Sequence, residues 1–209
     1  MPAALSVPHA EGRAGFLGAL DAFLGAVEAL DDHALLGASH CWGWTVVDVV
    51  THVRLGLDEV ACCLLTAGTS TAGPDRDAAT YWLTQPPGSS TDEVAGTLAI
   101  RRLASASRAP SGALVPLRQV TGALRSAVGR LPDGVLEFQG CVLTTGDFLA
   151  TWAVELAVHQ LDLAREVEVA PPTPESLDLA RRTVAALDAA GLPAASFSGR
   201  LGTAPSGRP

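Results

Sequence analysis

The stretch that decides the fold is Thr145-Gly-Asp-Phe-Leu-Ala-Thr-Trp-Ala-Val-Glu-Leu-Ala-Val-His-Gln-Leu-Asp-Leu-Ala-Arg165. It predicts one long helix that begins with a Thr or Asp cap. Apolar side chains cover nearly every side of this helix, and Gln160 is the main polar exception. A helix that is apolar nearly all round is typical of a protein interior. We therefore expect residues 145–165 to form a buried helix.

Three ionisable side chains share one stripe of this helix. At about 100° per residue, Glu155, His159 and Asp162 fall within roughly 60° of one another. Burying such groups without partners costs about several kcal/mol each, so something must satisfy them. A divalent metal ion is one answer, and a buried network of hydrogen bonds is the other.

Composition bounds the class of protein. A chain of 209 residues, 48% hydrophobic and 17% charged, has ample material for one sizeable core and at most a short appendage. Its net charge of −8 argues against nucleic acid or an anionic membrane surface as a partner. No long uncharged apolar run and no signal-peptide pattern occur, so we expect no membrane span and a cytoplasmic location. All 14 basic residues are Arg, which indicates a bacterial chain from a GC-rich genome.

The remaining chain predicts further helices and few other elements. Apolar spacing favours helices over about 12–30, 45–67, 91–106, 115–130 and 175–190. Whether 91–106 and 115–130 are one broken helix or two stays open. Residues 135–143 alternate as a short extended segment does, and 68–90 form a long loop of the kind that is often functional or mobile. We expect a flexible N-terminus over 1–10, one all-α bundle over 11–191 and a disordered tail over 192–209.

A second histidine lies on the helix expected over 45–67. Thr45 followed by Asp48 is a capping-box pattern, with Asp in place of the commoner Glu. His52 shares a stripe of this helix with Asp48 and Glu59. The four cysteines offer less, because a cytoplasmic chain keeps thiols and no C-x-x-C pair occurs. They are Cys41, Cys62, Cys63 and Cys141.

Glu155 and His159 are one helical turn apart, so both side chains can reach one point about 5–6 Å wide. His52 is the natural third ligand. Two imidazoles and a carboxylate suit zinc with an open position, or nickel, iron or manganese. Asp48 and Asp162 would then orient the imidazoles through hydrogen bonds.

Simpler interpretations of the same residues stay open. An E-x-x-x-H pattern is common on helices, and a single buried histidine is more often a satisfied core residue than a ligand. Asp162 has Arg165 as an alternative partner, and Asp48 is a cap before it is anything else.

Two of these segments resemble a known family. Gly43-Trp-Thr-Val-Val-Asp-Val-Val-Thr-His52 resembles the GWTxxDVxxH signature of the DinB-like, maleylpyruvate isomerase N-terminal superfamily. Val154-Glu-Leu-Ala-Val-His-Gln-Leu-Asp162 is similar to its second signature, ExxxHxxD. The resemblance covers roughly residues 12–190 and implies a four-helix metal-binding bundle, usually with zinc. It places the metal ligands at His52, Glu155 and His159.

The resemblance also implies a chemistry. Characterised relatives use low-molecular-weight thiols such as mycothiol, for cis–trans isomerisation of maleylpyruvate or for thiol S-transfer. A bound metal lowers the pKa of a coordinated thiol. The isomerase proper carries a further C-terminal domain, whereas a short Gly- and Pro-rich tail follows Gly191 here. An Arg is common within the first signature, at the position of Val47.

Two functions from different classes follow. The first is a divalent-metal-dependent isomerase or S-transferase, with a mycothiol-like thiol and a small electrophilic substrate as partners. The second is a metal-binding module of the same superfamily with a binding or regulatory role and no turnover. In the first case, Tyr81 and Trp82 in the 68–90 loop would shape the mouth of the pocket. Pairing of two bundles as a homodimer is compatible with either function.

Overall fold

The computed structural model describes residues 5–66, 72–84 and 90–191. Within these ranges the chain is mostly helical, with one small antiparallel sheet, so the prediction of an all-α fold is confirmed. In chain order the elements are α1 (His9–Glu28), α2 (Asp32–Leu35), α3 (Val46–Thr66), the 3-10 turn η1 (Thr80–Thr84), α4 (Ser90–Ala104), the 3-10 turn η2 (Pro110–Ala113), α5 (Leu114–Arg130), β1 (Val135–Phe138), β2 (Cys141–Thr144), α6 (Thr145–Leu163) and α7 (Pro174–Ala189).

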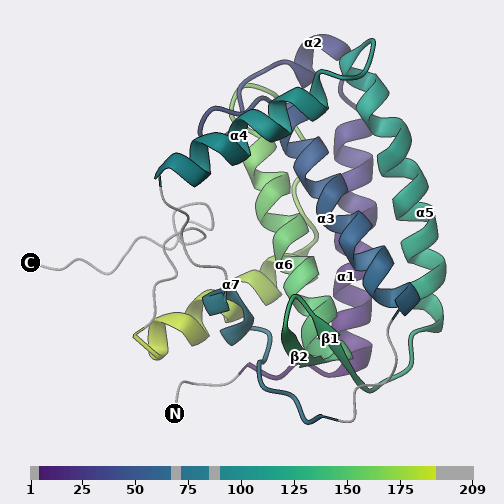
Figure 1. Ribbon diagram of the computed structural model, residues 1–209, viewed down its shortest axis with the longest axis vertical. Helices are drawn as coiled ribbons and strands as arrows, with labels where there is room; N and C mark the ends of the chain where they lie inside the picture. The colour runs from purple at the N-terminus through teal and green to yellow at the C-terminus, as the bar shows by residue number, and fades with distance from the viewer. Residues whose placement is uncertain (1–4, 67–71, 85–89, 192–209) are drawn as a thin grey trace, which may run out of the picture.

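Four long helices, α1, α3, α5 and α6, form the bundle (Figure 1). α1 packs against α5 and α6, and α3 packs against the same two helices. Each of the four helices therefore has two neighbours in the bundle. α1 and α6 run in one direction, whereas α3 and α5 run in the other (Figure 1). Parallel neighbours need a long crossover connection, which explains why η1, α4 and η2 separate α3 from α5.

α6 is the buried helix that its sequence predicts. Its residues are buried except for Glu155, His159 and Leu161, which are half-buried. The N-cap is Thr144, one residue earlier than expected, and its hydroxyl accepts a hydrogen bond from the Asp147 N–H at 3.0 Å. Two of the three half-buried residues are therefore the candidate metal ligands of this helix.

The hairpin of β1 and β2 occupies the segment expected to be extended. Its strands pair from Val135 with Thr144 to Phe138 with Cys141. Gln139 and Gly140 form the turn, and both have positive φ angles, 49° and 75°. Because β2 continues directly into α6, the hairpin fixes the start of the central helix.

The N-terminal segment contacts the bundle. Of residues 1–10, which were expected to be flexible, 1–4 lie outside the described residues, whereas Val7 is buried in the core and α1 begins at His9. The Val7 N–H donates to Asp147 Oδ1 at 2.7 Å, so the segment is attached to the start of α6. Periodicity did not reveal this, since a single hydrogen bond to a distant carboxylate leaves no repeating pattern.

The other connections also refine the prediction. α4 and α5 are two separate helices joined through η2, and the four-residue α2 follows α1. No helix in the described ranges is both long enough and apolar enough to cross a membrane. The tail expected to be disordered, residues 192–209, lies outside the described residues.

Glycines let α1 and the N-terminal segment lie against α6. A Cβ atom on Gly12 would collide with the carbonyl oxygen of Gly146, and a Cβ on Gly146 would collide with the carbonyl oxygen of Val7. Both obstacles are backbone atoms, which cannot rotate away as a side chain does. The close approach of these segments therefore depends on the absence of side chains here.

We expect Gly12→Ala to lower the free energy of unfolding by about 1–3 kcal/mol, because the new methyl group forces the backbone of α1 away from α6. Gly25→Ala is the matched control in the same helix, since a Cβ there meets no atom within 4 Å. That variant should gain about 0.5–1 kcal/mol from helix propensity. Urea denaturation of both variants measures the difference, and equal stabilities would contradict the packing argument.

Candidate metal centre

His52, Glu155 and His159 converge at one point between α3 and α6. His159 Nε2 lies 3.1 Å from Glu155 Oε1, and His52 Nε2 lies 3.5 Å from the same oxygen. One candidate ligand atom from each residue lies within 4.8 Å of the other two. The structure thus brings together the three side chains singled out from the sequence, two from α6 and one from the neighbouring helix.

Asp162 determines which nitrogen of His159 faces this point. The carboxylate is fully buried, and its Oδ2 lies 3.0 Å from His159 Nδ1. A neutral imidazole that donates its Nδ1–H to Asp162 keeps the lone pair on Nε2, directed at Glu155 and His52. This arrangement of carboxylate, imidazole and open nitrogen is the one that commonly orients histidine ligands of metals.

Even without a metal, the charges of Glu155 and His159 stabilise each other. Burial opposes ionisation of Glu155, but the adjacent His159 and His52 imidazoles outweigh it and hold the pKa of this carboxyl well below its usual range. Burial likewise opposes the charged form of His159, yet the Glu155 charge and the Asp162 hydrogen bond raise its pKa well above the ordinary value. Glu155 therefore stays ionised, and a proton occupies the space between it and His159 that a cation would take.

Asp48 lies at the N-terminus of α3. Its Oδ2 accepts hydrogen bonds from the backbone N–H and the hydroxyl of Thr45, both at 2.8 Å. The bond from the Thr45 N–H is the one that the third residue of a capping box accepts, whereas the Asp48 N–H donates to the Thr45 carbonyl oxygen and not to its hydroxyl, so half of the predicted box is formed. The further role suggested for Asp48, orientation of an imidazole, stays a prediction. On its own helix end His52 contacts Trp44, whose ring centroid lies 5.0 Å from that of the imidazole.

Two cavities open onto the convergence point from different sides. The first has a volume of about 460 Å³ and reaches Glu155 and His52 past Trp152, Tyr81 and Trp82. The second, of about 600 Å³, reaches His159 and His52 past Trp42 and Trp44 under α4. Tyr81 and Trp82 therefore lie where the sequence placed them, at the wall of a pocket. An ion held by the three side chains would keep coordination positions open to both cavities.

Polar groups at the outer end of the first cavity are linked to one another. The Tyr81 hydroxyl donates to Gln139 Oε1 at 2.8 Å, and Gln139 Nε2 donates to Glu59 Oε2 at 2.8 Å. Gly56, which also lines this cavity, lets the indole edge of Trp152 approach α3 closely, because a Cβ there would come within 2.6 Å of the ring. The cavity thus combines an aromatic wall with a hydrogen-bonding rim.

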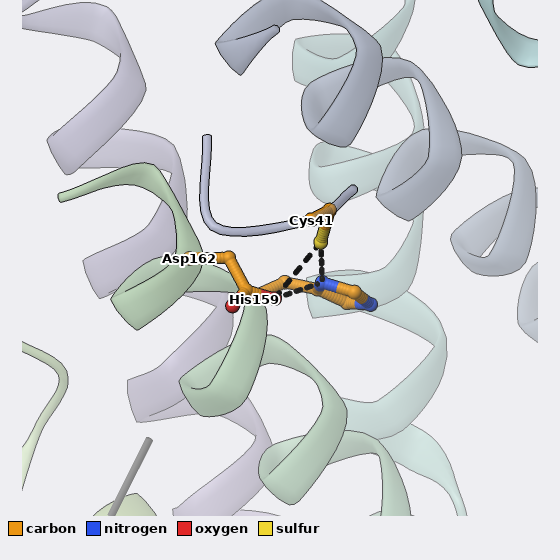
Figure 2. A group of neighbouring side chains, drawn as sticks. All are labelled: Cys41, His159 and Asp162. Atoms are coloured by element: carbon orange, nitrogen blue, oxygen red, sulfur yellow. Dashed lines mark hydrogen bonds and ion pairs between the residues drawn. The ribbon is translucent and has the colours of Figure 1, made fainter. Parts of the chain in front are cut away.

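Cys41 is the residue near the site that the sequence analysis missed. Its Sγ donates to Asp162 Oδ2 at 3.2 Å and lies 4.0 Å from His159 Nδ1 (Figure 2). It comes from the loop before α3, two residues ahead of the Gly43 that opens the first signature. That proximity in sequence is the available signal, and it is weak because a single cysteine in a loop has no spacing pattern that predicts a ligand.

The donor set fits a divalent first-row ion. Two imidazole nitrogens and one carboxylate oxygen lie close enough to share an ion, and both flanking cavities leave room for water or a substrate. Three protein ligands plus an open position is the arrangement of catalytic rather than structural zinc sites. A histidine ligand in such sites commonly donates its other ring N–H to a carboxylate, and Asp162 is placed to accept it from His159.

Comparison with known families agrees with this geometry. The model of the mycothiol maleylpyruvate isomerase N-terminal domain matches residues 16–164, a range that contains all three candidate ligands. No curated protein and no solved structure matches the chain significantly. The family match spans well over half of the 209 residues. The chain therefore belongs to the family of the mycothiol maleylpyruvate isomerase N-terminal domain, within the DinB-like superfamily.

Proposed function

We propose that this protein is a divalent-metal-dependent enzyme that uses a mycothiol-like low-molecular-weight thiol to isomerise, or transfer sulfur to, a small electrophilic substrate. The observation that carries the proposal is the convergence of His52, Glu155 and His159 beside two cavities. Zinc is the metal that this donor set favours, with nickel, iron or manganese as substitutes. The family to which the chain belongs supports the choice of thiol.

The residues of the chain have distinct parts in this proposal. A bound divalent ion supplies one piece of chemistry, a lowered pKa of a coordinated thiol, so that thiolate exists at neutral pH. Asp162 holds the His159 ring in its binding orientation, and Trp44 packs against His52. Glu155 carries the negative charge that makes a cation favourable at a half-buried point.

The two cavities provide separate places for two reactants. His52 lines both, so a group bound in either one approaches the same point. The aromatic walls, Trp152 and Trp82 in one cavity and Trp44 in the other, offer apolar surfaces on which the two reactants can pack. This arrangement would hold the thiol and the electrophile close together for a bimolecular reaction.

A metal-binding module without turnover is the second candidate. It is favoured by the rim of the first cavity, where Tyr81, Gln139 and Glu59 hydrogen-bond to one another. Polar groups engaged in this way are less ready to act as a general acid or base. The thiol experiment below separates the two functions.

Metal content tests the ligand set. We expect purified protein to hold one zinc per chain and His52→Ala to lose it, because two donors on one helix do not retain the ion through dialysis. Asp162→Asn should weaken zinc about 10–100-fold, since it leaves the ligands but misorients His159. His33→Ala, an exposed residue of α2, is the control. The decisive comparison uses Cys41→Ser, because a thiolate beside His159 also binds zinc: equal zinc in Cys41→Ser and in Cys41→Ser/His52→Ala by mass spectrometry would remove the metal claim.

Zinc affinity should fall as pH falls, because the raised pKa of His159 means that a proton must leave before the ion binds. The loss is about tenfold per pH unit for each proton displaced. Competition with a chromogenic chelator across pH measures it. A flat profile would show that His159 is not a ligand.

In metal-free protein, the same His159–Glu155 pair makes the free energy of unfolding depend on pH. The His159 pKa is raised on folding, so its contribution is complete below the unfolded pKa of about 6.5 and is lost as pH rises through the folded value. Glu155, whose pKa is lowered, adds stability that disappears only in acid. We expect the melting temperature of chelator-treated protein to fall at alkaline pH and Glu155→Gln to flatten that fall. An unchanged alkaline slope in Glu155→Gln would contradict this.

Thiol binding distinguishes the proposed enzyme from a metal-binding module without turnover. Titration calorimetry with mycothiol, glutathione and bacillithiol should show saturable binding of one thiol to zinc-loaded protein and none to protein treated with chelator. Consumption of maleylpyruvate or of a thiol-reactive fluorogenic electrophile then reports turnover. Zinc-loaded protein that binds none of these thiols would favour the non-catalytic module.

A further inference from the structure

We propose that Cys41, His159 and Asp162 form a second metal position, on the opposite side of the His159 ring from His52 and Glu155, which selects thiophilic divalent ions such as Cd²⁺. The inference goes beyond the proposed function, because it concerns another set of donors and another class of ion. Figure 2 shows the three side chains directed at one another, Cys41 from the loop before α3 and the other two from α6.

The distances suit one ion. His159 Nδ1 and Asp162 Oδ2 are 3.0 Å apart, Cys41 Sγ and Asp162 Oδ2 are 3.2 Å apart, and Sγ and Nδ1 are 4.0 Å apart. For a tetrahedral zinc ion, bonds of about 2.0–2.3 Å place the donor atoms about 3.3–3.7 Å apart, and a larger ion such as Cd²⁺ places them farther apart. The separation between Sγ and Nδ1 is already of this size, whereas the two separations that involve Asp162 must widen as the ion takes the place of the hydrogen-bonded protons.

Charge balance favours an ion at this position. The Cys41 thiol donates to Asp162 Oδ2, and the His159 Nδ1 proton is directed at the same oxygen. A divalent ion displaces two protons to solvent, one from the Cys41 thiol and one from His159 Nδ1, and the ring keeps the proton on Nε2 that faces Glu155. Thiolate and carboxylate together carry two negative charges, so the complex with a neutral imidazole and a divalent ion has no net charge. A neutral cluster is the form that a buried site tolerates best.

The loop that carries Cys41 is already fixed in place. The His40 N–H donates to the Asp162 carbonyl oxygen at 2.8 Å, which holds the loop over the end of α6. Ser39 Oγ accepts from the Cys41 N–H at 3.2 Å and donates to the Trp44 carbonyl oxygen at 2.9 Å. The donors are therefore assembled before any ion arrives, which avoids the cost of ordering a loop on binding.

An ion can also reach the position. Cys41 and His159 line the cavity under α4, and Cys41 borders a second opening of about 430 Å³ beside Arg165 and Glu166. Both openings leave room for a water molecule as a fourth ligand.

The two metal positions compete for one residue. A neutral imidazole has a single lone pair, on Nε2 or on Nδ1, so His159 serves one position at a time. Nitrogen and carboxylate donors prefer borderline or harder ions, whereas a thiolate prefers soft ones. The identity of the ion thus decides which side of the ring is occupied.

Cadmium titration of metal-free protein tests the second position, because a thiolate bound to Cd²⁺ gives an ultraviolet charge-transfer band that nitrogen and oxygen ligands do not give. We expect the band to saturate at one equivalent in wild type, to persist in His52→Ala and to be lost in Cys41→Ser. The double variant Cys62→Ser/Cys63→Ser is the matched control and should keep the band.

Alkylation provides a second readout in the unmodified chain. Cd²⁺ should protect Cys41 from iodoacetamide, as mapped by mass spectrometry, while the exposed Cys62 stays reactive. Absence of the band in wild type, its persistence in Cys41→Ser, its loss in His52→Ala or failure to protect Cys41 would each overturn the proposal. Zinc binding at the first position is read separately, from the zinc content of Cys41→Ser, so either proposal can fail without the other.

Discussion

The hydrogen bond between Asp162 and His159 is the interaction on which the site depends. It joins a fully buried carboxylate to an imidazole one turn away on α6, over 3.0 Å. By occupying Nδ1, Asp162 turns Nε2 toward Glu155 and His52. Without this bond the ring could rotate or exchange its two nitrogens, and the three candidate ligands would no longer meet.

The rest of the bundle fixes the position of α6. The backbone of α1 lies directly against that of α6 at Gly12 and Gly146, and β2 of the hairpin continues without a break into the first turn of α6. The crossover between α3 and α5 brings α3 alongside α6 with His52 facing Glu155. A site whose ligands come from two packed helices is placed more accurately than one on a loop, because neither helix can move without breaking core contacts.

Periodicity predicted the parts of this design that repeat along a helix. The apolar surround of α6 and the turn-by-turn spacing of Glu155 and His159 are such features, and they sufficed for the fold and for the convergence with His52. Contacts made by single loop atoms have no period. The attachment of Val7 to Asp147 and the placement of Cys41 over Asp162 by one backbone hydrogen bond from His40 are of this kind. They needed coordinates, because only the folded chain brings residues so distant in sequence together.

Charge distinguishes the two sides of the His159 ring. On the His52 side, Glu155 supplies one negative charge against the two positive charges of a divalent ion, so an anionic ligand from outside the protein remains favourable. On the Cys41 side, thiolate and Asp162 already supply two, and an external thiolate would add an uncompensated charge to a buried cluster. The charge balance therefore supports the proposal that a thiol binds on the His52 side, where a single carboxylate leaves one charge of a divalent ion unmatched, and not on the Cys41 side.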